Sequence, residues 1–270
     1  MTMNAKTALI TGASSGIGAT FARQLAAKGY NLFLVARRRD RLASVANELQ
    51  KAHSVSVETL LADLANLSDI EKVERRISKI ENLSTLINNA GFGVSGNFAE
   101  TDPDKQIDMM NVHIVASVRL CRAALPGMIA RHHGTIINVA STGAFVPIPG
   151  HIMYNATKAY LVFFSEALQA ELARTGVNVQ ALCPGFTYTE FHDTSEFTTF
   201  NRSRIPKLLW MSAEEVVTKS LKALKRNKTV YIPGFINRCY VAAMRNRMIS
   251  PLLFRFVKRK SRELYESVSN

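Results

Sequence analysis

The chain has little of what marks a secreted, membrane-spanning or metal-binding protein. Its 270 residues hold three cysteines, Cys121, Cys183 and Cys239, and an odd number of widely spaced cysteines is typical of reduced thiols inside the cell. No apolar run reaches the roughly 18 residues that span a bilayer, and residues 1–6 lack the apolar core of a secretory signal. The six histidines have no metal-binding spacing. We therefore expect a cytoplasmic protein without a metal site.

Acidic residues are also scarce, since 34 lysines and arginines face 21 aspartates and glutamates and give a formal net charge of +13. The excess is local, because residues 237–262 carry eight basic residues and no acidic one. A nucleic-acid-binding surface would need a recognised binding motif beside this charge, and the sequence has none. We therefore expect no nucleic-acid partner.

The basic stretch begins a C-terminal extension at about residues 237–270. Its apolar residues recur at helical spacing, opposite a basic face, at Met244, Met248, Leu252 and Phe256. Pro251 should break this extension into two helices. One interpretation is a peripheral membrane segment that collects apolar substrates. The other, which we favour, is a helix that covers the substrate pocket or packs on a partner subunit.

Short apolar runs alternate with helical stretches along the chain, and 47% of the residues are apolar, as in globular proteins. Most runs are continuously apolar and β-branched, which is typical of parallel strands buried on both faces. The expected strands are Thr7–Thr11, Asn31–Ala36, Val55–Leu61, Thr85–Asn88, Gly134–Ala140, Val177–Cys183 and Thr229–Ile232. The expected helices are Ile17–Lys28, Asp40–Ala52, Ser68–Ile80, Asp104–Arg131, Tyr154–Thr175 and Ala213–Arg226.

This alternation predicts a single Rossmann-type catalytic domain over residues 1–270. Its fold class is α/β, with a doubly wound, seven-stranded parallel sheet and helices on both faces. Such sheets bind their ligands at the carboxyl ends of the strands. We therefore expect the chemistry in the loops that follow the strands.

The loop after the first expected strand is rich in glycine and runs into a helix. Glycines let the backbone turn sharply and approach a ligand closely, and a pyrophosphate can then bind the free N–H groups at the helix N-terminus. The residues expected to hold it are Gly12, Ser14, Ser15, Gly16, Ile17 and Gly18. The alternative is a glycine-rich turn that binds nothing.

The end of the second expected strand indicates the cofactor. Enzymes that use NAD place an acid near this point to bond the ribose 2′-hydroxyl, whereas this chain has Ala36 followed by three arginines. A guanidinium binds a phosphate through two parallel hydrogen bonds. We infer NADP(H), held by Arg37 first and Arg38 second; the alternative is that the arginines only begin a solvated helix. Asp63 either bonds the adenine or caps the next turn.

Further motifs follow in order at strand ends, and together they resemble the short-chain dehydrogenase/reductase family over nearly all of residues 5–235. The motifs are Thr11–Gly18, Asp63-Leu64, Asn88-Asn89-Ala90-Gly91, Asn111, Ser141, Tyr154 with Lys158 four places on, and Pro184-Gly185 with Thr189 four places on. Each is weak alone, and their order makes the set specific. The branch that looks most similar holds hydroxysteroid dehydrogenases and ketoacyl reductases.

The resemblance implies a role for each matching residue. Asn111, Ser141, Tyr154 and Lys158 would be catalytic. The cofactor would also contact Asp63, Leu64, Asn89, Ala90, Gly91, Tyr154, Lys158, Pro184, Gly185, Thr187 and Thr189. Thr187 departs from the valine or isoleucine that is usual there, although its backbone could still bind the carboxamide. The family pairs through its two long helices, so we expect a homodimer or homotetramer.

The chemistry of these residue types suits carbonyl reduction. After hydride reaches the carbonyl carbon, the oxygen needs a proton, and tyrosine has an ordinary pKa near ~10. Lys158 lies one helical turn from Tyr154, and we expect its charge, with the nicotinium ring of the oxidised cofactor, to lower the pKa of the phenol. Ser141 would bond the developing oxyanion. The alternative is a cofactor-binding sensor or scaffold without turnover, which would not need the acid.

The segments that face the substrate are apolar. Residues 142–150 carry no charge, and a lid segment at about residues 190–211 contains Phe191, Phe197, Phe200 and Trp210. These aromatic residues either contact an apolar substrate or only pack the loop, and we weigh the two equally. We expect a bulky hydrophobic ketone or aldehyde. His151 lies near Tyr154 and is expected to be structural or solvated rather than to face the substrate.

Overall fold

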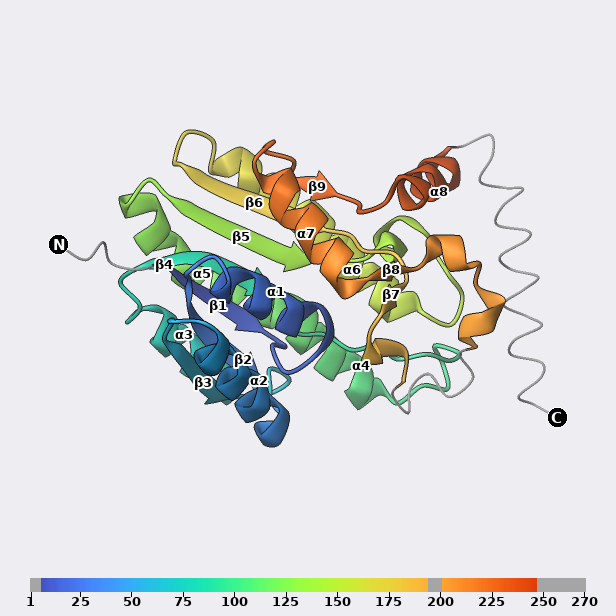
Figure 1. Ribbon diagram of the computed structural model, residues 1–270. Coiled ribbons are helices and arrows are strands. Elements are labelled where there is room, and N and C mark those ends of the chain that lie inside the picture. Colours follow the sequence, from blue (N-terminus) through green and yellow to red (C-terminus); the bar gives the residue numbers. More distant parts are fainter. Residues whose placement is uncertain (1–5, 194–200, 247–270) are drawn as a thin grey trace.

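The computed structural model describes residues 6–193 and 201–246. Its main sheet has seven strands in the order β3-β2-β1-β4-β5-β6-β9, and every pair in it is parallel. The strands are β1 (Thr7–Thr11), β2 (Asn31–Ala36), β3 (Val57–Leu61), β4 (Leu83–Asn88), β5 (Gly134–Val139), β6 (Val177–Leu182) and β9 (Val230–Tyr231). The order reverses between β1 and β4, so the predicted doubly wound fold is confirmed (Figure 1).

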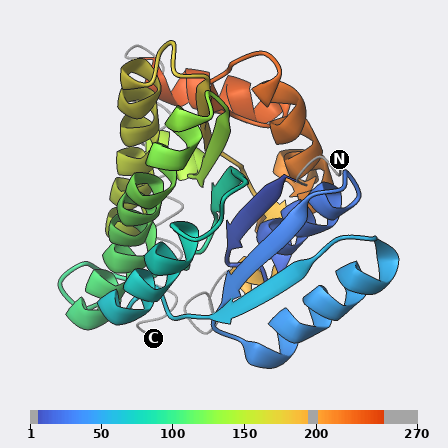
Figure 2. The same cartoon turned by 90° about the vertical axis from the view of Figure 1, so that its left-hand side faces the viewer.

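Helices cover both faces of the sheet (Figure 2). On one face lie α1 (Gly16–Ala26), α2 (Arg39–Ala52) and α7 (Ala213–Leu224), and on the other α3 (Leu67–Ile77), α5 (Ala116–Ala130) and α6 (Ile152–Glu171). Two apolar clusters hold these layers, one around the fully buried Phe21 and one around Leu86 and Leu120. Strands with alternate residues in two cores must be apolar throughout, which explains their continuous hydrophobic runs.

The long helix expected over Asp104–Arg131 has three parts. It begins as α4 (Pro103–Met110), widens into a π-helical turn over Asn111–Val115, and continues as α5. Ala116 N–H donates to the Asn111 carbonyl, five residues back instead of four. The apolar periodicity continues through this turn, so the sequence pattern did not predict it.

The same continuous helix, Pro103–Ala130, is long and apolar enough to cross a membrane by length and composition alone. Half of its most apolar window is buried inside the protein. Leu120, Cys121 and Met128 on this helix belong to the core under the sheet. The structure therefore places it as a core helix.

Two further parts of the chain lie beyond the carboxyl edge of the main sheet (Figure 1). A short parallel pair, β7 (Thr187–Tyr188) and β8 (Met211–Ser212), forms the base of the lid segment. Helix α8 (Phe235–Arg245) is the described part of the basic extension, and it buries Val241 and Met244. The expectations for Phe197, Phe200, Met248, Pro251, Leu252 and Phe256 lie outside the described residues.

Candidate active site

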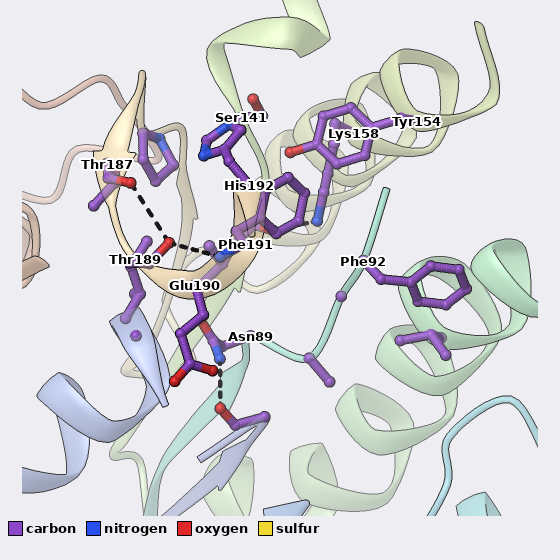
Figure 3. A pocket seen from close by; sticks show the side chains of 18 of the residues that line it. Asn89, Phe92, Ser141, Tyr154, Lys158, Thr187, Thr189, Glu190, Phe191 and His192 are labelled. Atoms are coloured by element: carbon purple, nitrogen blue, oxygen red, sulfur yellow. Dashed lines mark hydrogen bonds between the residues drawn. The ribbon is translucent and has the colours of Figure 1, made fainter. Parts of the chain in front are cut away.

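A cavity of about 640 Å³ opens at the carboxyl ends of β1, β2, β4, β5 and β6. Its lining includes every predicted site residue except Gly18 and Asn111. Tyr154 and Lys158 extend into it from one helix, and Thr187, Thr189 and Glu190 come from the opposite wall (Figure 3). Residues that are more than a hundred positions apart in the chain thus share one cleft, as expected at the switch in strand order of a doubly wound sheet.

The phosphate loop lines one end of the cavity. Gly12 has a φ of +65°, which favours glycine, and a Cβ there would lie 2.8 Å from the Asn89 side-chain nitrogen. Gly18 lies behind the loop, where a Cβ would overlap the Gly12 carbonyl oxygen. Ser15 begins α1 without a side-chain capping bond, so the first-turn N–H groups have no side-chain cap to compete with an anionic ligand.

The two predicted arginines have different neighbours. Arg38 donates to Ser15 Oγ at 2.6 Å and to Ser14 Oγ at 3.3 Å, so its guanidinium lies against the phosphate loop. Arg37 pairs with Asp63 at 3.3 Å, and Asp63 also accepts from the Ala65 N–H, as a turn cap does. The guanidinium nearest the loop is therefore that of Arg38.

Glu190 joins the lid segment to the arginine end of the cavity. Its carboxylate accepts from Arg38 at 2.9 Å and also from Arg41. These two cations hold the pKa of Glu190 below its usual range. Nothing in the spacing of the sequence predicted Glu190 or Arg41 here, although Glu190 directly follows the predicted Thr189.

The loop after β4 is tied to β1 by four hydrogen bonds. Thr11 Oγ1 accepts from the N–H groups of Asn89 and Ala90, each at 3.0 Å. The Asn89 side-chain amide donates to the Thr11 and Gly12 carbonyls at 3.0 and 3.2 Å. Side chains thus hold together the two strand ends at which the sheet order reverses.

Ser141, Tyr154 and Lys158 lie near one another in the lining of the cavity (Figure 3). Ser141 Oγ accepts from the Gly143 N–H at 3.0 Å, which leaves its own hydrogen free to donate. Lys158 is 4% exposed, donates to the Val139 carbonyl at 2.9 Å, and has its Nζ 5.7 Å from the centre of the Tyr154 ring. A hydroxyl, a phenol and an ammonium are therefore within one small volume.

Burial dominates the electrostatics of these groups. Burial raises the pKa of Tyr154, and the hydroxyl of Ser141 beside it only partly opposes the shift. Burial lowers the pKa of Lys158 to about 7. In the cofactor-free protein, burial thus raises the pKa of the phenol; the expected lowering by Lys158 together with the nicotinium ring stays a prediction for the cofactor-bound protein.

Asn111 does not line the cavity. It begins the π-helical turn, and its side-chain amide donates to the Ala65 carbonyl at 3.1 Å. This bond ties the helix to the loop after β3. In the described part of the chain, the side chain of Asn111 bonds the Ala65 carbonyl and not Tyr154 or Lys158, so its catalytic role stays a prediction.

The other end of the cavity is mostly apolar and is lined in part by Phe186, Phe191 and Ile205. His151 and His192 also line it, so His151 faces the cavity rather than solvent alone. Burial lowers the pKa of His192 to about 4, which keeps this imidazole neutral. His192 and Asn155 also line the cavity, and no spacing in the sequence predicted either residue.

The two described aromatic residues among those weighed, Phe191 and Trp210, divide between the two roles that we weighed equally. Phe191 lines the cavity, with its ring centre 5.8 Å from that of Tyr154. Trp210 is 8% exposed and stacks on Tyr188 with ring centres 4.7 Å apart. Since Trp210 is absent from the lining, it packs the base of the segment instead of facing the cavity.

Comparison with known proteins gives relatives over most of the chain. The family model described as short chain dehydrogenase matches residues 6–198. A very-long-chain 3-oxoacyl-CoA reductase of Phaeosphaeria nodorum is 36% identical over 82% of this chain and 63% of its own length. A human protein named inactive hydroxysteroid dehydrogenase-like protein 1 is 33% identical over 70% of this chain and 58% of its own length. The matched part of the chain thus spans about 60% of these relatives.

Solved structures agree with the sheet and its helices. A short-chain dehydrogenase from Sphingobium yanoikuyae in complex with NADPH has a TM-score of 0.79 and 36% identity, and the match covers 85% of this chain and 88% of that one. A bulky-bulky ketone specific alcohol dehydrogenase from Comamonas testosteroni has a TM-score of 0.76 and 35% identity, with 86% and 87% covered.

Proposed function

The chain belongs to the short-chain dehydrogenase family of oxidoreductases, and from that premise we propose that it is an NADPH-dependent carbonyl reductase. It would transfer hydride between nicotinamide and a carbonyl or secondary alcohol, within one catalytic domain. The observation that carries the proposal is the meeting of Ser141, Tyr154 and Lys158 in one cavity that ends at a phosphate loop and an arginine.

The residues present fit a nicotinamide cofactor that carries a 2′-phosphate. A close approach of backbone and ligand is built into Gly12, where even a Cβ would meet the Asn89 amide. Arg38 and the loop serines offer charged and neutral donors at one end, with Arg37 beside them. We assign Thr187 and Thr189 on the opposite wall to the carboxamide end. The solved structure of the short-chain dehydrogenase from Sphingobium yanoikuyae in complex with NADPH supports this choice.

The proposed mechanism divides the work among three side chains. The bound cofactor would supply the hydride that is added to the carbonyl carbon. Ser141 would donate its free hydrogen to the carbonyl oxygen, which binds it more tightly as negative charge develops. Tyr154 would donate its phenolic proton to the same oxygen, giving the alcohol. The Lys158 ammonium, beside the ring, would stabilise the phenolate that remains.

A bulky hydrophobic ketone or aldehyde is the substrate class that we propose. Phe186, Phe191 and Ile205 give the substrate end an apolar wall, and such walls bind apolar groups by removing them from water. The names of two relatives, a very-long-chain 3-oxoacyl-CoA reductase and a bulky-bulky ketone specific dehydrogenase, support this class. The neutral imidazole of His192 adds a hydrogen-bonding group to that wall.

The alternative function is a cofactor-binding sensor or scaffold that turns over nothing. It receives support from the human relative, which is named as inactive. A panel of ketones, aldehydes and alcohols, followed by NADPH absorbance, separates the two functions. Turnover of any panel member supports the reductase, whereas NADPH binding without turnover across the panel would favour the sensor.

We propose a cytoplasmic homo-oligomer that pairs through α4, α5 and α6. Large apolar residues on this side are exposed: Ile107 at 53%, Phe163 at 75% and Tyr160 at 41%. Such residues are usually covered in an assembly. Sedimentation of the whole protein tests this, and Phe163→Asp should shift it towards monomer.

For the basic extension we propose packing on the protein rather than on a membrane. Val241 and Met244 of α8 are each 3% exposed, whereas Phe235 at the start of the helix is 71% exposed, and Arg245 lies over the Phe145 ring at 5.5 Å. A buried apolar face leaves less to insert into lipid. Flotation with anionic liposomes tests this: binding that is lost when residues 237–270 are removed would support the membrane alternative.

A further inference from the structure

His113 is a fully buried titratable side chain that the proposed reaction does not use. It is 1% exposed and lies in the π-helical turn Asn111–Val115, between α4 and α5. Such turns cost stability and are often retained where a side chain must be aimed at a functional site. Here the turn directs His113 between the loop after β4 and the catalytic helix α6.

Both ring nitrogens of His113 are engaged, and their partners allow one protonation state. Nδ1 lies 2.8 Å from Thr157 Oγ1, whose own hydrogen is donated to the Tyr154 carbonyl at 2.8 Å. Because Thr157 can then only accept, Nδ1 must carry the hydrogen. Nε2 accepts from the Phe92 N–H at 3.3 Å, so Nε2 must be bare. An imidazolium would carry a hydrogen on Nε2 as well, and this N–H would point at the Phe92 N–H, which is also a donor.

The surroundings favour the same neutral ring. Burial, with the nearby Lys158 ammonium, lowers the pKa of His113 well below its ordinary value. Gly91 leaves the space that the ring needs, since a Cβ there would lie 2.7 Å from His113 Nε2 and 3.5 Å from Lys158 Nζ. The glycine of the Asn89-Ala90-Gly91 motif thus makes room for His113 and Lys158 together.

The ring also touches the catalytic phenol. The ring centres of His113 and Tyr154 are 5.9 Å apart, and the planes meet edge-on at 73°. On the other side, Phe92 continues the cavity wall formed by Asn89 and Ala90. His113 therefore contacts α6 at Thr157 and at the ring of Tyr154, and contacts the loop after β4 at Phe92.

We propose that His113 is a positioning residue: its neutral imidazole, bonded to Thr157 and to the Phe92 N–H, fixes Tyr154 and Lys158 relative to the cofactor wall of the cavity. This inference rests on the proposed reductase activity. A small displacement of an acid from its productive geometry costs about 100-fold in rate. The bonds through His113 are the means by which this chain would prevent such a displacement.

The test compares His113→Leu, which removes both bonds, with His113→Asn, whose amide can still donate at the position of Nδ1. We expect His113→Leu to lower kcat about 10- to 100-fold, with the KM for ketone and the Kd for NADPH within about threefold, and His113→Asn to recover about tenfold. Thr157→Val should add no further loss to His113→Leu, because the two changes remove the same bond. Additive losses, or no recovery in His113→Asn, would overturn the proposal.

A matched control separates positioning from general destabilisation. Leu120→Ala in α5 removes a fully buried side chain away from the cavity; it should lower the melting temperature at least as much as His113→Leu and leave kcat within about twofold of wild type. Equal kcat losses in the two variants would assign His113 a structural role only.

A second measurement does not depend on turnover. Nitrogen chemical shifts of ¹⁵N-labelled histidine should show His113 as the neutral Nδ1–H tautomer even below the ordinary pKa of histidine, and Lys158→Met should raise the pKa of His113. An imidazolium at pH 6 would contradict the proposal. If wild type turns over no panel substrate while this tautomer is present, the reductase activity fails and the hydrogen-bond assignment stands.

Discussion

The two walls of the cavity are held in different ways. The cofactor and catalytic wall depends on buried hydrogen bonds, such as those of Thr11 to the loop after β4 and of Lys158 to Val139. The lid segment on the other wall depends on exposed ion pairs, Arg202 with Asp193 and Glu190 with two arginines, and on stacked rings. Buried bonds are expensive to break, whereas exposed pairs contribute roughly 0–1 kcal/mol each.

This difference separates the reaction from its substrate. A buried network permits few residue types at each position, so the reaction class is readable as a set of motifs. An exposed, aromatic wall tolerates many different side chains, so no sequence motif identifies the substrate. If this is right, substitutions in the first wall should change rate, cofactor affinity or stability strongly, and those in the second should change substrate affinity modestly.

The largest effect is expected for Tyr154→Phe, which removes the proposed acid and keeps the ring packed against His113 and Phe191. General acid catalysis contributes about 10² to 10⁴ in rate, so kcat should fall about 10³-fold while the Kd for NADPH stays within about threefold. Stopped-flow NADPH oxidation and fluorescence titration measure the two. A variant that kept a tenth of the activity would show that the phenol is not the acid.

Lys158→Met tests the energetic cost of the buried wall. The pKa of Lys158 is about 7 in the folded protein and near ~10.4 in an unfolded chain. Between these two pKa values the unfolded state binds more protons than the folded state, so the contribution of Lys158 to the unfolding free energy rises with pH. Below pH 7 the lysine is charged in both states, and the folded protein bears the full free-energy cost of burying the charged ammonium. We expect the cofactor-free variant to be more stable than wild type by about 1–3 kcal/mol at pH 6, with the gap closing by pH 10.

Urea unfolding of both proteins at pH 6, 8 and 10 measures this gap. Subtracting the unfolding free energy of wild type from that of the variant at each pH cancels the contributions of the other titrating groups. A gap independent of pH would mean that Lys158 stays charged in the folded protein throughout.

Arg38→Ala concerns the point at which the two walls touch, since Arg38 donates both to the phosphate loop and to Glu190. Loss of a charged hydrogen-bonding partner costs about 1.5–3 kcal/mol, so the Kd for NADPH should rise about 10- to 100-fold while the Kd for NADH changes less than threefold. Arg39→Ala is the matched control, because Arg39 does not line the cavity.

Arg37→Asp should shift the cofactor preference of the enzyme from NADPH towards NADH. Equal effects on both cofactors would contradict the 2′-phosphate assignment.

The sequence predicted the first wall well and the second poorly. Gly12, Ser141, Tyr154 and Lys158 follow strands at the spacing that the fold imposes, and the structure brings them together. His113 could not be found in this way, because its role depends on a π-helical turn that leaves the apolar pattern unchanged. The burial that raises the pKa of Tyr154 in the cofactor-free protein could not be predicted for a related reason: burial is a property of the packed fold, and no local spacing encodes it.

The smallest effect is expected for Arg202→Ala in the lid segment. Arg202 donates to the Thr189 carbonyl at 2.9 Å and to Asp193 at 2.6 Å, and it lies over the Trp210 ring at 5.8 Å. Because these contacts are partly exposed, their loss should lower the unfolding free energy by less than about 1 kcal/mol. Phe191, two residues after Thr189, would lose support, so the KM for a bulky ketone should rise about three- to tenfold while kcat stays within about twofold.

Arg119→Ala provides the matched control for that variant, since Arg119 pairs with Glu74 at 2.6 Å, is similarly exposed, and lies between α3 and α5 away from the cavity. It should cost a similar amount of stability and leave KM unchanged, which steady-state kinetics and urea unfolding can measure together. If Arg202→Ala changed kcat as strongly as His113→Leu, the lid segment would share in positioning the acid, and the separation between a wall for the reaction and a wall for the substrate would fail.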